Sequence, residues 1–264
     1  MGLYEELDRK DMLKRVMPLL QKGGYNIDPI TGKIVVQEYI AYNLPWIIVK
    51  SPKGMNCRMW STILFNHFAD DMKQPPSRCQ DCWKVVIRPT NIVELFGLLA
   101  LMKDVLAPQV YGCKCGVELR EYVHGLYGGY IYGVGLEQGK RQYELARKEV
   151  SEKLGEHIPV ILKRACTEFE QKFGDSAKWY VTPEQLLIEK SVYDMFDPKD
   201  VEQHEQPNFI KQHIMKKWIK YACAHGDEHY LKLVDKPLHA KYVKYHEDMP
   251  DGFEYTEPSF EGAI

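Results

Sequence analysis

The stretch GCKCG, residues 112–116, decides how the fold is read. It places two cysteines one residue apart, with a glycine on each side. In an extended segment the side chains at i and i+2 share a face, so Cys113 and Cys115 can point at one ion while Lys114 points away. The flanking glycines would let the backbone fold closely around that ion. The segment 110–116 is therefore expected to be a metal-binding loop.

A second cysteine pair, CQDC, precedes it in the chain and follows Pro75-Pro76-Ser77, a setting that favours a turn. Four thiolates are enough to close a tetrahedral zinc site. The sequence thus predicts a structural zinc ion held by four ligands, Cys79, Cys82, Cys113 and Cys115. An iron–sulfur cluster uses the same thiolates and is the alternative cofactor. Buried free thiols are the reading without a metal.

The composition narrows the class of protein. Hydrophobic residues make up 45% of the 264 residues and charged residues 27%, as in soluble globular proteins. A net charge of −2 argues against a surface that grips nucleic acid throughout. The N-terminus lacks a secretory pattern, and the most apolar stretch, 92–107, is too short to cross a bilayer. Seven cysteines fit metal binding in a reducing compartment, so we expect a cytoplasmic protein without membrane contact.

Hydrophobic periodicity predicts an α+β fold in two lobes. Residues 1–135 form a small mixed lobe that carries the metal site, and residues 136–264 form a mainly helical lobe with an acidic C-terminal tail. One continuous domain is the alternative. The expected strands are 33–40, 45–50, 83–89 and 116–123. The expected helices are 3–22, 59–68, 91–106, 136–154, 159–173, one from Pro183, and 208–224.

The segment 122–141 is rich in glycine and tyrosine and is the best candidate for a ligand pocket. Tyrosines can stack on a ligand, glycines let it approach the backbone, and cations can meet its negative charge. The candidate binding residues are Tyr127, Tyr130, Tyr132, Lys140 and Arg141. A packed hairpin whose tyrosines bridge core and water is the structural alternative.

Three residues are candidates for catalysis: Cys57, Arg58 and His124. A thiol beside a cation can become reactive because the cation lowers its pKa. Cys57 could equally be a fifth metal ligand or a small core residue near Trp60.

Two functions follow from these patterns. In the first, the zinc site holds together a binding or assembly subunit that contacts a protein, or a nucleic acid through the Lys-rich residues 211–245. In the second, the chain is a zinc or iron–sulfur enzyme with its pocket near Cys57, Arg58 and residues 122–141. No paired acid and base or nucleophile motif stands out in the sequence, which favours the first.

Overall fold

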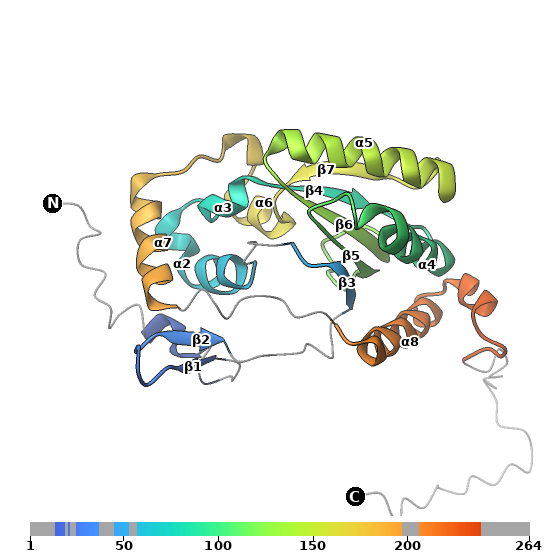
Figure 1. Cartoon of the computed structure of the whole chain (residues 1–264), viewed down its shortest axis with the longest axis horizontal. Helices are drawn as coiled ribbons and strands as arrows, with labels where there is room; N and C mark the ends of the chain where they lie inside the picture. Colours follow the sequence, from blue (N-terminus) through green and yellow to red (C-terminus); the bar gives the residue numbers. More distant parts are fainter. Residues whose placement is uncertain are drawn as a thin grey trace, which may run out of the picture.

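The computed structural model describes residues 14–18, 21, 25–36, 45–52, 57–196 and 206–238. Its centre is a five-stranded sheet in the order β3-β5-β6-β4-β7, in which every neighbouring pair is antiparallel (Figure 1). The strands of this sheet are β3 (Trp46–Lys50), β4 (Cys82–Ile87), β5 (Gly112–Val117), β6 (Tyr127–Val134) and β7 (Val160–Arg164). A separate two-stranded sheet pairs β1 (Tyr25–Ile27) with β2 (Ile34–Val36).

One face of the sheet packs against three helices, and we call it the core face. These helices are α4 (Ile92–Leu101), α5 (Leu136–Lys153) and α8 (Asn208–Ala224). Helix α4 continues directly into η2 (Met102–Leu106). Val85, Ile87 and Ile131 point into this core because alternate side chains of a strand share a face. Among the described residues, no helix is long and apolar enough to cross a membrane.

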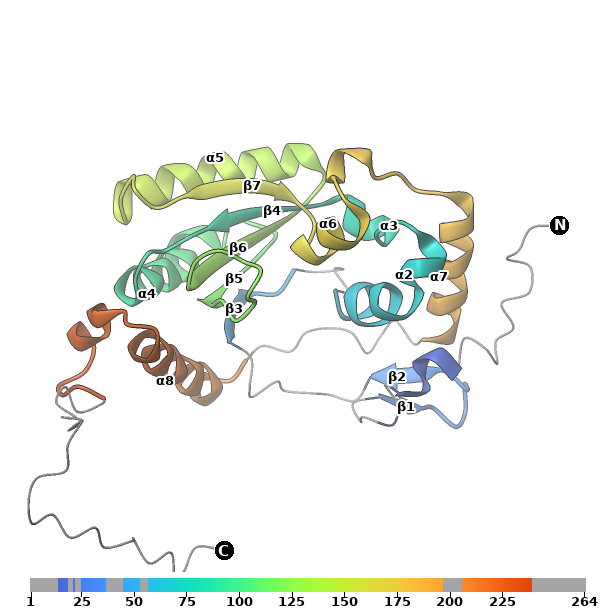
Figure 2. The ribbon, with the colours of Figure 1, turned by 180° about the vertical axis from the view of Figure 1, so that it is seen from behind.

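The opposite face of the sheet, which we call the pocket face, belongs to a second apolar cluster. That cluster joins Val86, Tyr130 and Tyr132 of the sheet to the remaining helices. Figures 1 and 2 show α2, α6 and α7 on the side of the sheet away from α4 and α8. The helices on this side are η1 (Arg58–Phe65), α2 (Asn66–Met72), α3 (Ser77–Gln80), α6 (Thr167–Phe173) and α7 (Pro183–Met195). Two short 3-10 turns are η3 (Ser176–Lys178) and η5 (Glu228–Lys232).

Several predicted elements are confirmed. The expected strand 45–50 corresponds to β3, and the expected helix 208–224 has the bounds of α8. The capping signal before Pro183 is also real, because Thr182 Oγ1 accepts a hydrogen bond from the Gln185 amide at 3.0 Å. The predicted helix 3–22 is described only at residues 14–18 and 21, which are helical. Residues 37–40 of a predicted strand and the acidic tail lie outside the described residues.

Three predictions of local structure are wrong: the loop 110–116, the strand 116–123 and the helix 159–173. GCKCG is not a loop but most of strand β5, which ends at Val117 instead of running to residue 123. The predicted helix 159–173 is strand β7 followed by α6. The sheet therefore takes its last strand from the C-terminal side of residue 135, while the division of the chain into two lobes stays a prediction.

Helix α4 lies directly on β6 at Gly129. A Cβ at this position would come within 2.5 Å of Leu98 Cδ2 and 2.8 Å of Met102 Cε, and both side chains are fully buried. Because neither neighbour has space to move into, we expect Gly129→Ala to lower the free energy of unfolding by about 1–3 kcal/mol in a urea titration.

Gly97 provides the matched control for this substitution. Its added Cβ would meet only the Cδ2 methyl of the half-buried Leu154, at 2.8 Å, which can turn aside. Alanine is also favoured over glycine inside a helix by about 1 kcal/mol. Gly97→Ala should therefore leave stability unchanged or raise it. An equal loss in both variants would contradict the close approach of α4 to β6.

The Gln206 side chain covers part of the outer edge of β3. The Gln206 side-chain amide accepts a hydrogen bond from the Ile48 amide at 2.8 Å and donates one to the Trp46 carbonyl at 3.1 Å. It thereby fills a donor and an acceptor position that a neighbouring strand would otherwise use. Gln206 is buried, so this contact is part of the packed structure.

Candidate functional site

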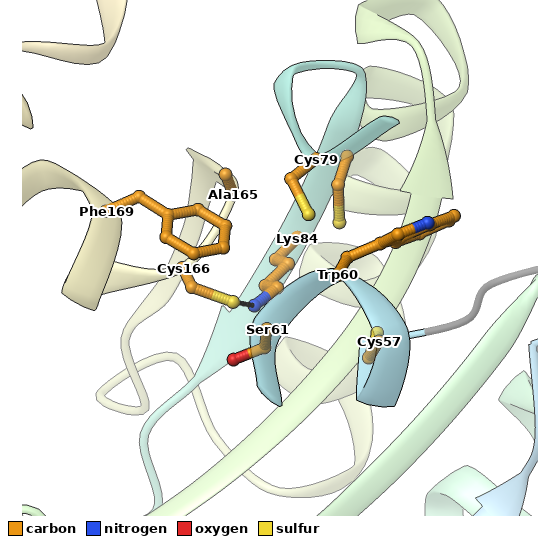
Figure 3. A pocket seen from close by; sticks show the side chains of 9 residues that line it. Cys57, Trp60, Ser61, Cys79, Lys84, Ala165, Cys166 and Phe169 are labelled. Atoms are coloured by element: carbon orange, nitrogen blue, oxygen red, sulfur yellow. Dashed lines mark hydrogen bonds between the residues drawn. The ribbon is translucent and has the colours of Figure 1, made fainter. Parts of the chain in front are cut away.

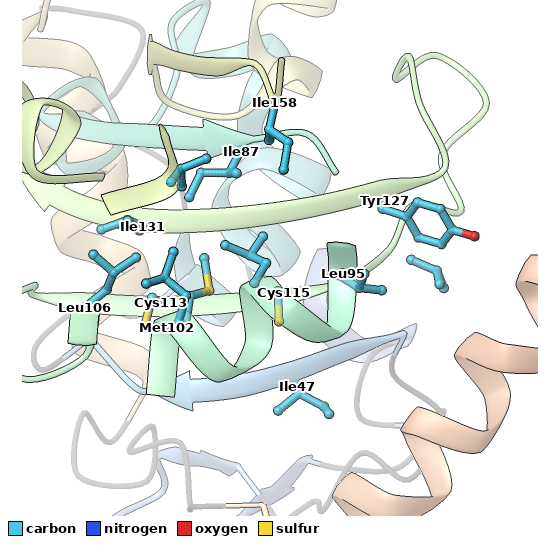
Figure 4. Packing of buried hydrophobic residues seen from close by; sticks show 14 of the residues in the cluster. Ile47, Ile87, Leu95, Met102, Leu106, Cys113, Cys115, Tyr127, Ile131 and Ile158 are labelled. Atoms are coloured by element: carbon cyan, nitrogen blue, oxygen red, sulfur yellow. The ribbon is translucent and has the colours of Figure 1, made fainter. Parts of the chain in front are cut away.

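The two predicted cysteine pairs lie on opposite faces of the sheet. Cys113 and Cys115 are fully buried in the core face, close to Met102 and Leu95 (Figure 4). Cys79 and Cys82 belong to the cluster on the pocket face. The prediction that Cys113 and Cys115 share one face of the strand is confirmed, but that face packs into the apolar core. The structure does not bring together the four thiols that were predicted to hold zinc.

The reason is the strand itself. Because GCKCG continues the alternation of a full β-strand, it sends both thiols into the core and Lys114 to the other face. Burial raises the pKa of Cys113 to about 11, and burial together with Cys113 raises the pKa of Cys115 further. Both groups are therefore neutral thiols that pack as small apolar side chains.

A different set of cysteines meets on the pocket face. Four thiols and one amine line a small cavity with a volume of about 20 Å3, enough for one water-sized group (Figure 3). We call it the thiol pocket. Its lining residues are Cys57, Trp60, Ser61, Cys79, Cys82, Lys84, Ala165, Cys166 and Phe169.

The pocket is assembled from three separate parts of the chain. Cys57 precedes η1, Cys79 and Cys82 come from α3 and the first residue of β4, and Cys166 is the N-cap residue of α6. The Ala165 amide donates to the Cys82 carbonyl at 2.8 Å, which ties the α6 segment to β4. Ala165 also has a φ of 49°, an uncommon conformation for a residue with a side chain, and such strain concentrates at functional sites.

Lys84 is the charged group of the thiol pocket. Its Nζ donates a hydrogen bond to Cys166 Sγ at 2.8 Å and lies 5.5 Å from the centre of the Tyr132 ring. Burial opposes its charge, but the neighbouring Cys166 and Tyr132 groups outweigh burial and hold the pKa of Lys84 well above its usual value. In the described part of the chain, no carboxylate forms an ion pair with this amine.

The remaining thiols of the pocket are poor acids as they stand. Burial raises the pKa of Cys57, although Lys84 opposes that effect, and burial raises the pKa of Cys82 to about 12. The pKa of Cys79 is also raised by burial. Within the described ranges, no three His, Cys, Asp or Glu side chains are close enough to hold a metal ion without movement.

Lys114 lies on the same face, with aromatic rings on several sides. Its Nζ is 4.9 Å from the centre of the Trp46 ring, 5.8 Å from that of Tyr130 and 5.9 Å from that of Tyr132. We call this group of four residues the lysine cage. Burial, and next the charge of Lys84, lower the pKa of Lys114 to about 8.

Beyond the cage, the pocket face carries a paired network of charges. Glu118 accepts two hydrogen bonds from Arg120, at 2.7 and 2.6 Å, and one from the Tyr130 hydroxyl at 2.7 Å. Arg120 also contacts Glu168 at 3.0 Å, and Arg88 lies 3.7 Å from Glu118. Burial raises the pKa of Glu118, but the bonds from Arg120 and Tyr130 outweigh burial and lower it. Glu118 is thus fully engaged, whereas Glu168 is bonded through Oε1 and its buried Oε2 has no hydrogen-bond partner among the described residues.

The residues predicted for ligand binding separate in space. Tyr130 and Tyr132 lie on the pocket face, whereas Tyr127 is buried elsewhere and its hydroxyl donates to Asp227 at 2.6 Å. Lys140 and Arg141 are exposed on α5, and Lys140 pairs with Glu137 at 3.1 Å. These two cations are therefore not part of the thiol pocket or the lysine cage.

The three catalytic candidates separate as well. Cys57 lines the thiol pocket, and His124 is exposed in the turn between β5 and β6. The side chain of Arg58 lies outside the described residues.

Sequence reasoning missed Lys84, Lys114 and Cys166 as members of the site. The alternation CWKVV places Lys84 on the same face of β4 as Cys82, so a signal for it was present. Cys166 carried no such signal, because its segment reads as a helix with an apolar face. Comparisons with family models, with curated proteins and with solved structures found no match to this chain.

Proposed function

We propose that the chain binds a metal through the thiolates of Cys57, Cys79, Cys82 and Cys166, with a zinc ion as the occupant. One observation carries the proposal: these four thiols line a single pocket with a half-buried lysine that donates to a sulfur. CQDC thus keeps its predicted role, while the second pair of ligands changes from Cys113 and Cys115 to Cys57 and Cys166.

The charge of Lys84 supports this assignment. A half-buried ammonium needs an anion nearby, and thiolates are the groups of this pocket that can become anionic. Zinc binding deprotonates its cysteine ligands, so four thiolates around one divalent ion give a centre with a charge of about −2. Lys84 would partly neutralise that charge through its hydrogen bond to Cys166 Sγ.

Coordination requires the thiols of the pocket to move closer together. Tetrahedral zinc holds its sulfurs at about 2.3 Å from the metal, which places them about 3.8 Å from one another. Since no three ligands of the described residues are that well gathered, Cys57 and Cys166 must approach the CQDC pair. Both side chains are half-buried, so they are less tightly held than the fully packed core cysteines.

Within this proposal the chain is a cytoplasmic, metal-stabilised subunit that contacts a partner protein or nucleic acid. The metal would join η1, the start of β4 and α6, which are far apart in sequence. The candidate basic surface lies on α8, where Lys216 and Lys220 are exposed and Trp218 is buried. Residues 239–245 of the predicted Lys-rich segment lie outside the described residues.

The direct test is metal content after purification without oxygen. We expect about one zinc per chain in the wild type, and a loss of at least tenfold in bound zinc for Cys57→Ser and for Cys166→Ser. Cys223→Ser, which changes a half-buried cysteine on α8 outside the pocket, should keep its metal. If the protein instead contains stoichiometric iron and absorbs broadly in the visible range, the same four cysteines hold an iron–sulfur cluster and not zinc.

Two outcomes would overturn the proposal. One is a chain with no stoichiometric metal. The other is metal that survives both pocket substitutions but is lost in Cys113→Ser or Cys115→Ser, which would return the site to the core face. Nucleic-acid binding is tested separately, and absence of binding at low salt would remove that partner.

A further inference from the structure

Lys84 and Lys114 form a pair across strand β6. Lys84 is opposite Tyr132 in the β4–β6 register, and Lys114 is opposite Tyr130 in the β5–β6 register. Both amines lie over the ring of Tyr132, at 5.5 and 5.9 Å. The two lysines therefore share a tyrosine between them, with the thiol pocket beside Lys84.

The surroundings of the two amines differ. Lys84 Nζ donates to a sulfur, Cys166 Sγ. Among the described residues, Lys114 Nζ instead contacts aromatic rings. Two other half-buried lysines are bonded to oxygen: Lys50 donates to two carbonyls at 2.8 and 2.6 Å, and Lys163 donates to Glu170 at 2.8 Å. Lys114 is thus desolvated and beside a second cation, the two conditions that make a lysine nucleophilic.

We propose that Lys114 is a nucleophilic lysine that condenses with the carbonyl group of a small anionic aldehyde or keto acid. The neutral amine attacks the carbonyl carbon and forms a C–N bond. The amine nitrogen loses its two protons, which pass to the carbonyl oxygen, and this oxygen leaves as water, so that a C=N bond replaces C=O and no electrons are gained or lost. The nearby cation Lys84, which has no ion pair among the described residues, attracts the negative charge of the substrate.

The cage supplies the rest of the geometry. Trp46, Tyr130 and Tyr132 place flat aromatic rings around the amine, at 4.9 to 5.9 Å from their centres, and a small planar molecule would lie against these rings. Arg120 is already paired with Glu118 and Glu168, so its charge is balanced and it is not counted among the groups that attract the substrate.

The supply of neutral amine agrees with this role. With a pKa of about 8, about 10% of Lys114 is neutral at pH 7, against about 0.04% of a lysine with the usual pKa of about 10.4. Lys114 therefore has on the order of 100-fold more of the reactive, neutral form than an ordinary lysine.

The test is reductive trapping with pyridoxal 5′-phosphate, an anionic aldehyde, followed by borohydride and peptide mass spectrometry. At limiting reagent and pH 7.5, we expect Lys114 to be modified at least tenfold more than Lys50 and Lys163. Lys114→Arg should remove this product and leave the labelling of the other lysines unchanged. Circular dichroism on the variant checks that the fold is intact.

Equal labelling of all lysines, or labelling that omits Lys114 in the folded wild type, would overturn the proposal. The wild-type measurement is sufficient for this, even if a variant fails to fold. Repeating the trapping on Cys166→Ser separates the two proposals, because Lys114 should react whether or not metal is bound. If Cys166→Ser loses its metal but Lys114 is still labelled, the reactivity of Lys114 is independent of the metal site.

Discussion

Replacing Trp218 by alanine is expected to lower the free energy of unfolding by about 3–5 kcal/mol. Trp218 is fully buried on α8, its ring packs edge to face on Phe96 at 5.7 Å, and its Nε1 donates to the Pro45 carbonyl at 2.7 Å. It thus joins α8 to α4 and to the residue before β3. Alanine would leave a cavity at this junction and an unpaired carbonyl. Urea titration followed by circular dichroism measures the loss.

Trp218→Phe is the matched control. Phenylalanine keeps an aromatic ring against Phe96 but cannot donate to Pro45, so we expect a loss of about 1–2 kcal/mol. If alanine costs less than phenylalanine, or if both cost less than about 1 kcal/mol, then α8 does not pack on the core face as described.

The second large effect is expected at Asp227. Its carboxylate accepts hydrogen bonds from the Ile92 amide and the Tyr127 hydroxyl, both at 2.6 Å, and from the His229 amide at 3.0 Å. It therefore holds the N-terminus of α4, where a negative charge is favourable, and satisfies a buried phenol. We expect Asp227→Ala to lower the free energy of unfolding by about 2–5 kcal/mol, because two buried donors lose their acceptor.

Asp227→Asn separates charge from hydrogen bonding. The amide oxygen can still accept, so the loss should be about 1–2 kcal/mol at pH 7. Burial raises the pKa of Asp227, but hydrogen bonds from Tyr127, Ile92 and His229 outweigh burial and lower it. A lowered pKa adds stability that is complete above the unfolded value of about 3.9 and is lost as pH falls through the folded value.

The pH dependence gives a direct comparison. Stability should fall more steeply with acid in the wild type than in Asp227→Asn, and the two curves should converge below about pH 4. Parallel curves across this range would show that the Asp227 charge does not stabilise the fold.

The long elements of the fold could be predicted from the sequence, and the short apolar ones could not. Helix α8 has a clear helical stripe, and α7 begins at a capping box, so local chemistry determines both. VILKR of β7 is too short for its period to distinguish a strand from a helix, and pairing with β4 decides the outcome.

One half of the candidate site, the CQDC pair, could be predicted from the sequence, and the other half could not. CQDC is a local motif, and its two cysteines do line one pocket. Cys57 and Cys166 meet it only because β4 pairs with β7 and η1 packs over the sheet, which are contacts between distant parts of the chain. GCKCG misled because CxC is compatible with a metal loop and with a strand, and the neighbouring strands β3 and β6 select the strand.

The Gln206 side chain has a consequence for self-association. An exposed edge strand can template pairing with another chain, and proteins usually prevent this with charged residues, proline or a covering element. Here one buried side-chain amide bonds the Ile48 amide and the Trp46 carbonyl. A second chain would first have to displace Gln206, and with it the start of α8. Within the described residues, Gln206 thus shields the start of the edge strand WIIVK, at Trp46 and Ile48, from pairing with another chain.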